Sequence, residues 1–189
     1  MQSMYDRGYV LVKIHDLAYE TTDENGNPKF VYGDIMLPEG KKAFVMSQDD
    51  VCYYEYMKGD GFATRMVIGE DGYPTTEMEQ EDGSVITGDF DLVPILETFI
   101  KEHPGFSYKG ARAIIAFTGY NGILGYRTDE SYKDTNPNYE EDLKQAAAVA
   151  GLGRVIPAPR RYRRAGRSGG RRAGGKARQP FGVLQVGRG

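Results

Sequence analysis

The sequence contains no tryptophan, a single cysteine and only two histidines. The lone cysteine, Cys52, excludes a disulfide within the chain, and we interpret it as a buried structural thiol. No apolar run is long enough to cross a membrane, and residues 1–7 lack the apolar core of a signal peptide. We therefore expect no membrane segment and no export signal in this chain, and the compartment stays open.

Acidic residues are absent from one part of the chain, and this splits its charge. Residues 154–189 carry ten arginines and Lys176 without a single Asp or Glu, which leaves residues 1–153 with a net charge of −14. An acidic body repels nucleic acid and anionic membranes at long range, so we expect neither as a partner of the body. The basic tail has the opposite preference.

The apolar content is enough for one domain of ordinary size, since 40% of the 189 residues are hydrophobic. Residues 9–14 predict a strand, and the apolar runs at 43–46 and 113–118 predict strands buried in a parallel sheet. An Asn-Gly pair predicts a turn over residues 23–28 rather than a calcium loop, whose first acidic ligand is missing. Residues 62–89 alternate short strands with Asp-Gly turns, which predicts a small antiparallel meander.

Two helices are predicted between and after these strands. Asp91 is a suitable N-cap for a helix over residues 92–103, whose apolar residues recur at helical spacing. A second, alanine-rich helix is predicted over residues 139–150, capped by Asn138 and acidic in its first turn. The alternation of strands and helices indicates an α/β class over residues 1–150. Residues 151–189 are rich in Arg, Gly and Pro, and we expect this tail to be disordered.

The candidate catalytic residues are Asp49 and Asp50, which directly follow the predicted strand at 43–46. In α/β folds the loops at the carboxyl ends of parallel strands converge on a common cleft. The pair could also be a simple turn, or the N-cap of a helix over residues 51–57. Taken alone, an Asp-Asp pair does not separate these interpretations.

Longer motifs carry a resemblance to a known family. Residues 44–50, FVMSQDD, are similar to the first motif of the nodulation-type polysaccharide deacetylases, a family-four type of carbohydrate esterase. The resemblance is to a gut-bacterial branch of that superfamily and covers about residues 5–150. The further segments that carry it are 37–42 (LPEGKK), 53–57 (YYEYM), 102–108 (EHPGFSY) and 118–128 (TGYNGILGYRT).

The resemblance implies a fold, a reaction and a set of roles. It implies a distorted parallel β/α barrel, present here in part, with the predicted meander as an insertion. The implied reaction is the metal-dependent hydrolysis of N- or O-acetyl groups on a polysaccharide or a peptidoglycan-type glycan. Asp49 would be the general base, Asp50 a ligand of a divalent metal, usually zinc, and Tyr120 and Arg127 would contact substrate. Members of the family are usually secreted or attached to the cell envelope.

The sequence departs from the family pattern where the other metal ligands are expected. A catalytic zinc takes about three protein ligands, and the family supplies two histidines four residues apart after the helix that corresponds to residues 139–150. No histidine follows that helix here, because His15 and His103 are the only two. We expect His15 at a strand end and His103 at a helix end, and neither as a ligand. The family's later arginine, aromatic and final histidine are also missing.

We therefore expect this chain to be an incomplete deacetylase domain that is inert as it stands. The change of composition near residue 150 indicates that the tail is out of frame or foreign to the domain.

Three other interpretations remain. Glycines at 119, 122 and 125 after a strand suggest a dinucleotide site, although their spacing does not match the fingerprint. The basic tail could bind nucleic acid through phosphates, with Tyr162 stacked on a base. A non-catalytic carbohydrate-binding domain could use five tyrosines as stacking surfaces. These are Tyr53, Tyr54, Tyr56, Tyr120 and Tyr126.

Overall fold

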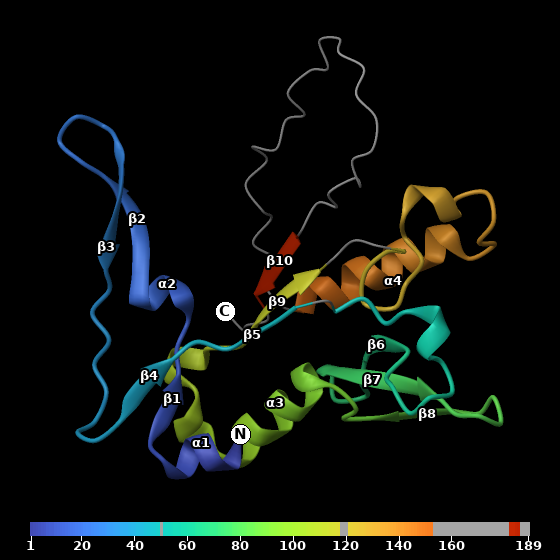
Figure 1. Ribbon diagram of the computed structural model, residues 1–189, viewed down its shortest axis with the longest axis horizontal. Helices are drawn as coiled ribbons and strands as arrows, with labels where there is room; N and C mark the ends of the chain where they lie inside the picture. The colour runs from blue at the N-terminus through green and yellow to red at the C-terminus, as the bar shows by residue number, and fades with distance from the viewer. Residues whose placement is uncertain (50, 118–120, 153–181, 186–189) are drawn as a thin grey trace, which may run out of the picture.

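The computed structural model describes residues 1–49, 51–117 and 121–152, and the backbone of residues 182–185 (Figure 1). The described strands include two short parallel pairs, and in Figure 1 an antiparallel hairpin lies at the left of the molecule and a three-stranded antiparallel sheet at the right. The predicted mixed α/β class is therefore confirmed. The described strands form separate sheets of two or three strands and no closed barrel.

The parallel pairs are built around the segment that precedes Asp49. Strand β1 (Tyr9–Leu11) pairs in parallel with β4 (Lys42–Phe44), and β5 (Ser47–Gln48) pairs in parallel with β9 (Ile114–Phe117). The predicted parallel pairing is confirmed. The predicted single buried strand at 43–46 is wrong, because β4 ends at Phe44, β5 begins only at Ser47, and none of residues 43–46 is fully buried. Phe44 and Met46 on one face of this segment pack against the core, whereas Ala43 on the other face is exposed.

The two predicted long helices are confirmed. Helix α3 (Leu92–Glu102) begins at Asp91, whose side chain accepts a hydrogen bond from the Leu92 N–H. Helix α4 (Tyr139–Leu152) has three acidic residues in its first turn, where the helix dipole favours negative charge. The short helices α1 (Gln2–Asp6) and α2 (Ile14–Leu17) were not predicted, and α2 ends the strand expected over residues 9–14.

The antiparallel sheets follow the predicted turns. Strands β2 (Ala18–Thr22) and β3 (Pro28–Tyr32) form a hairpin around Gly26, and β6 (Arg65–Ile68), β7 (Pro74–Glu79) and β8 (Val85–Gly88) form the predicted meander. The hairpin projects from one side of the molecule, whereas the meander packs beside α3 and α4 (Figure 1). The described 3-10 helices are η1 (Glu55–Met57), η2 (Pro104–Phe106), η3 (Tyr108–Gly110) and η4 (Glu130–Tyr132).

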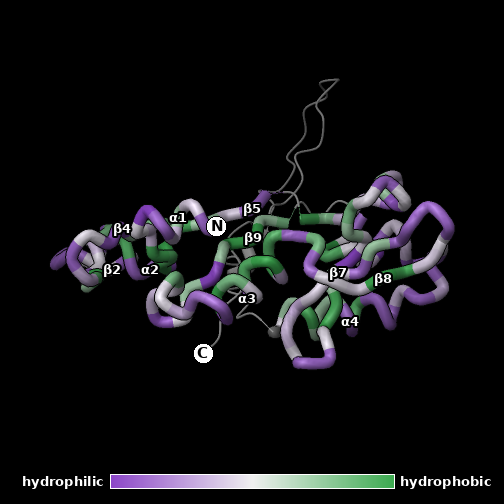
Figure 2. Tube along the Cα trace, turned by 90° about the horizontal axis from the view of Figure 1, so that it is seen from below, coloured by the Kyte–Doolittle hydropathy of each residue, from purple (hydrophilic) through white to green (hydrophobic). Residues whose placement is uncertain are grey.

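Two clusters of buried side chains hold these elements together, and Figure 2 shows the hydrophobic segments along β9 and α3 in the middle of the molecule. One cluster joins β1, α3 and η2 and includes Leu11, Leu96 and Phe106. The other joins β6, β9 and α4 and includes Met66 and Ile115. Glu97 of α3 and Arg112, just before β9, form a buried ion pair. The described helices include none long and apolar enough to cross a membrane.

Residues 153–181 and 186–189 of the tail predicted to be disordered lie outside the described residues. Gly151 and Leu152 are the last residues of α4, and the backbone of β10 (Gly182–Gln185) pairs antiparallel with β9, so for these six residues the prediction is wrong. The edge of a strand such as β9 offers backbone N–H and C=O groups, and the backbone of a short segment such as β10 can form hydrogen bonds with them. The sheet order is therefore β10-β9-β5, with β9 in the centre.

Candidate functional site

Asp49 lies directly after β5, at the carboxyl end of the parallel pair that β5 forms with β9. Its side chain is exposed to solvent. Asp50, the candidate metal ligand, and Tyr120, a candidate substrate contact, lie outside the described residues. The backbone N–H of Val51 donates to the carbonyl of Ala116 in β9, so the segment after Asp49 stays attached to the sheet. The position of Asp49 therefore agrees with the strand-end location that the sequence suggested.

Asp91 joins the end of β5 to the start of α3 through its two carboxylate oxygens. Gln48 Nε2 donates to Oδ1 over 2.9 Å, and the Tyr53 hydroxyl donates to Oδ2 over 2.5 Å. Burial raises the pKa of the Tyr53 hydroxyl well above its usual value of 10.0, and the negative charge of Asp91 raises this pKa further. Tyr53 therefore stays protonated and remains a donor to Asp91 at neutral pH.

A hollow of about 370 Å³ opens beside this hydrogen-bonded cluster. Half of its lining residues are aromatic, and two of these, Tyr56 and Phe62, are 77% and 51% exposed. The hollow lies next to Asp49 in the chain, because Gln48 lines it. The remaining lining residues are Val51, Tyr53, Tyr54, Met57, Ala63, Phe90 and Asp91.

Arg127, the other candidate substrate contact, is buried and holds the loop around Tyr53. One of its nitrogens, Nη2, donates to the Tyr53 carbonyl over 2.7 Å, and Nε lies 3.5 Å from a carboxylate oxygen of Glu55. Its Nη1 is buried without a hydrogen-bond partner among the described residues. These contacts give Arg127 a role in positioning the loop, and its predicted contact with substrate stays a prediction.

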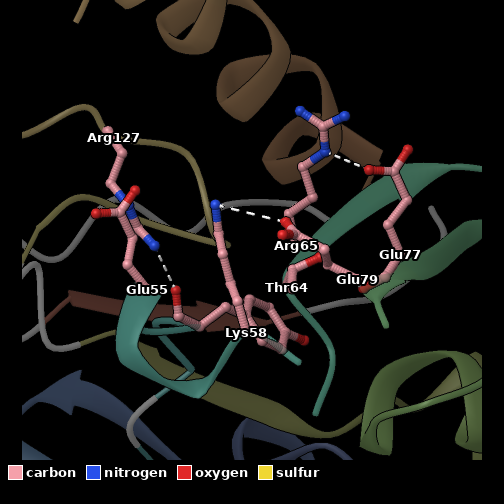
Figure 3. Close-up of polar contacts among 8 residues, drawn as sticks. Glu55, Lys58, Thr64, Arg65, Glu77, Glu79 and Arg127 are labelled. Carbon is pink, nitrogen blue, oxygen red and sulfur yellow. Dashed lines mark hydrogen bonds and ion pairs between the residues drawn. The ribbon is translucent and has the colours of Figure 1, made fainter. Parts of the chain in front are cut away.

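Two further ion pairs lie near the one between Arg127 and Glu55, as Figure 3 shows. Arg65 and Glu77 join β6 to β7 over 2.5 Å, and Lys58 lies 3.7 Å from Glu79. The hydrogen bond from Arg65 to Glu77 raises the pKa of the Arg65 guanidinium. Lys58, Arg65 and Arg127 are therefore each matched with a carboxylate among the described residues.

The histidines do not lie where a metal ligand would be needed. His15 is exposed on α2, so the prediction that it lies at a strand end is wrong, because residues 14–17 form a helical turn. His103 is the C-cap of α3, as predicted, and its ring packs against Tyr5 and Phe99. Gln48, the neighbour of Asp49, is hydrogen-bonded to Asp91 at the opposite end of this helix. The helix has 11 residues and is about 16 Å long, so His103 and Gln48 lie at its two ends.

No group of three His, Cys, Asp or Glu side chains that could hold a metal occurs in the described part of the chain. Taken by themselves, the described donors around Asp49 therefore do not supply the three protein ligands of a catalytic zinc site.

Sequence reasoning missed the cluster of Gln48, Tyr53 and Asp91 as a unit. Asp91 was expected only as a helix cap, and Gln48 was given no role. Gln48 and Tyr53 lie 43 and 38 residues before Asp91 in the sequence, so no local pattern connects them. The run of tyrosines at 53–57 was the one signal that pointed to this place.

Comparisons with family models, with curated proteins and with solved structures gave no match to this chain.

Proposed function

We propose that this chain is a polysaccharide deacetylase-type domain, built as part of a distorted β/α barrel, with Asp49 as its would-be general base. The observation that supports this proposal is the place of Asp49 at the carboxyl end of β5, in a parallel pair with β9. The motifs at 44–50, 102–108 and 118–128 resemble those of the family and favour the same function. Its target would be an acetylated polysaccharide or a peptidoglycan-type glycan.

The chemistry open to this chain is limited by its donor set. An exposed carboxylate such as Asp49 can accept a proton from water within hydrogen-bond reach. In the family a divalent metal, usually zinc, held by an aspartate at the position that Asp50 matches and by two histidines, supplies the acidity that makes such a water reactive near neutral pH. The sequence has no histidine pair four residues apart, and the described donors do not fit the metal. We therefore propose that the chain itself does not hydrolyse acetyl groups.

Acetate release from N-acetylglucosamine oligomers in the presence of zinc tests this proposal. We expect none from the chain, and release from a version extended with the family's missing segments, including the two histidines four residues apart after α4. In that version Asp49→Asn should lower the rate by about a hundredfold or more, the usual contribution of a general base. Acetate release from the unaltered chain that disappears on Asp49→Asn would overturn the proposed inertness.

Binding of nucleic acid through the basic tail remains an alternative prediction. Its arginines and Tyr162 lie outside the described residues, so no contact supports it. The affinity would have to fall steeply with added salt if phosphate contacts carried it.

A further inference from the structure

The described cations of this acidic body divide into those paired with carboxylates and those that are not. The ion pairs involve Lys58, Arg65, Lys101, Arg112 and Arg127. Lys41 and Lys109 form no ion pair among the described residues, and each ammonium group lies over an aromatic ring instead. Lys41 Nζ is 5.6 Å from the ring centroid of Tyr5, and Lys109 Nζ is 4.9 Å from that of Tyr108. An aromatic face attracts an ammonium group without neutralising it, so both charges stay available to an anion.

Both lysines line one hollow of about 310 Å³, which we call the lysine hollow. Among the described residues that line it there is no Asp or Glu. Val10 of β1 contributes to its wall, and Lys41 directly precedes β4, which is the parallel partner of β1. Asp49 follows β5, past the opposite end of the same segment. The lysine hollow is therefore separate from the place of the proposed base.

The backbone of Lys109 has a conformation that residues other than glycine rarely adopt. Its φ of 47° and ψ of 40° lie in the left-handed region, within the short helix η3. Such a conformation costs free energy at a lysine, and strained residues of this kind concentrate at sites that hold ligands. The strain therefore favours a role for the Lys109 side chain in the lysine hollow.

The rest of the wall is largely apolar and limits what the ligand can be. Val10, Met36, Leu37 and Pro38 line the lysine hollow, and Met36 is 81% exposed. A ligand that fits needs an organic group for these side chains and a negative charge for the ammonium groups. A phosphate monoester carries about two negative charges at neutral pH, which match two lysines, and ammonium groups bind phosphate as point charges.

We propose that the lysine hollow binds a small phosphate monoester, with the phosphate at Lys41 and Lys109 and the organic group against the apolar wall. The net charge of the acidic body repels long polyanions, whereas one small anion responds to the charges within a Debye length of about 8 Å. A volume of about 310 Å³ is near the lower end for ligand pockets, which suits an ester with a single ring. This site does not depend on the proposed function.

Calorimetric titration of the full chain with phenyl phosphate tests the site. We expect saturable binding that Lys41→Gln and Lys109→Gln each weaken about fivefold, the loss of one partly exposed ion pair. The matched control is Lys144→Gln, which removes the same charge from an exposed position on α4, across the molecule from β1 and β4 (Figure 1). This control should bind as the unaltered chain does. Far-ultraviolet circular dichroism verifies that all three variants fold.

Inorganic phosphate and phenol carry the two halves of the ligand separately, and each should bind more weakly than phenyl phosphate. The arginines of residues 154–189 also attract anions, so dependence on Lys41 and Lys109 assigns the site, rather than binding alone.

Three outcomes would overturn the site. These are the absence of saturable binding at millimolar phenyl phosphate, an equal loss in the Lys144→Gln control, and inorganic phosphate that binds as tightly as phenyl phosphate. Acetate release is not a readout here, so the lysine hollow and the proposed base stand or fail separately.

Discussion

The hairpin β2–β3 and the meander β6–β8 are built from the same local signals but differ in how far their side chains are buried. Both are antiparallel strands joined by turns with a glycine at positive φ, such as Gly26 in the hairpin and Gly72 in the meander. The hairpin has no buried residue, and Tyr32 is 93% exposed. In the meander Met66 is 2% exposed and contributes to the core shared with β9 and α4. Turn chemistry therefore sets the shape of a sheet, and packing decides whether that sheet stabilises the domain.

The sharpest test of this difference removes one large side chain from each sheet. Met66→Ala should lower the free energy of unfolding by about 2–5 kcal/mol, because it leaves a cavity in the core. Phe30→Ala should change it by less than about 0.5 kcal/mol, since that ring is exposed. Urea denaturation followed by circular dichroism measures both. Equal losses in the two variants would mean that the hairpin is as well packed as the meander.

The next effect concerns the hydrogen bonds that close the meander. Thr76 is fully buried, its hydroxyl donates to the Gly88 carbonyl over 2.6 Å, and it accepts from the Phe90 N–H over 3.0 Å. Thr76→Val keeps the shape and leaves both groups without this partner, so it should cost about 1–3 kcal/mol. Thr76→Ser restores the hydroxyl and should recover part of the loss. A Val variant as stable as the unaltered protein would mean that these bonds add nothing.

A smaller change in stability is expected from substitutions in the turns of the two sheets. Gly26 and Gly72 have φ of +81° and +76°, and a Cβ added at either would meet no atom within 4 Å. Alanine at each position should therefore cost about 1 kcal/mol of backbone strain alone. We expect Gly72→Ala to lower global stability by this amount. In Gly26→Ala, hydrogen exchange should speed up within the hairpin while global unfolding stays unchanged, and a global loss there would contradict the comparison.

The smallest effect depends on pH. Hydrogen bonds from Lys101 and from the Tyr73 backbone lower the pKa of the Asp71 carboxyl below its usual 3.8 and tie the meander to α3. A lowered folded-state pKa gives stability that is present above pH 3.8 and lost as pH falls through the folded value. Asp71→Asn should therefore lower the melting temperature slightly at neutral pH and have no effect at strongly acid pH. A difference that persists in acid would contradict this account.

Local signals made the two long helices and the turns predictable. The Asp91 cap, the apolar spacing of α3 and the Asp-Gly turns each act within a few residues, so the sequence was enough to place them. The break between β4 and β5 depends on which partner strand lies beside each half, namely β1 and β9. The hollow depends on Gln48 and Tyr53 meeting Asp91, and on a positive φ at Tyr53 that few non-glycine residues adopt.

The central claim is that the carboxylates of this chain lack the partners needed to hold a catalytic metal. The zinc content of the unaltered chain after dialysis against a chelator tests this claim most directly. We predict no stoichiometric zinc, measured by mass spectrometry under native conditions. One zinc ion per chain that survives dialysis, and is lost on Asp50→Asn, would contradict the account.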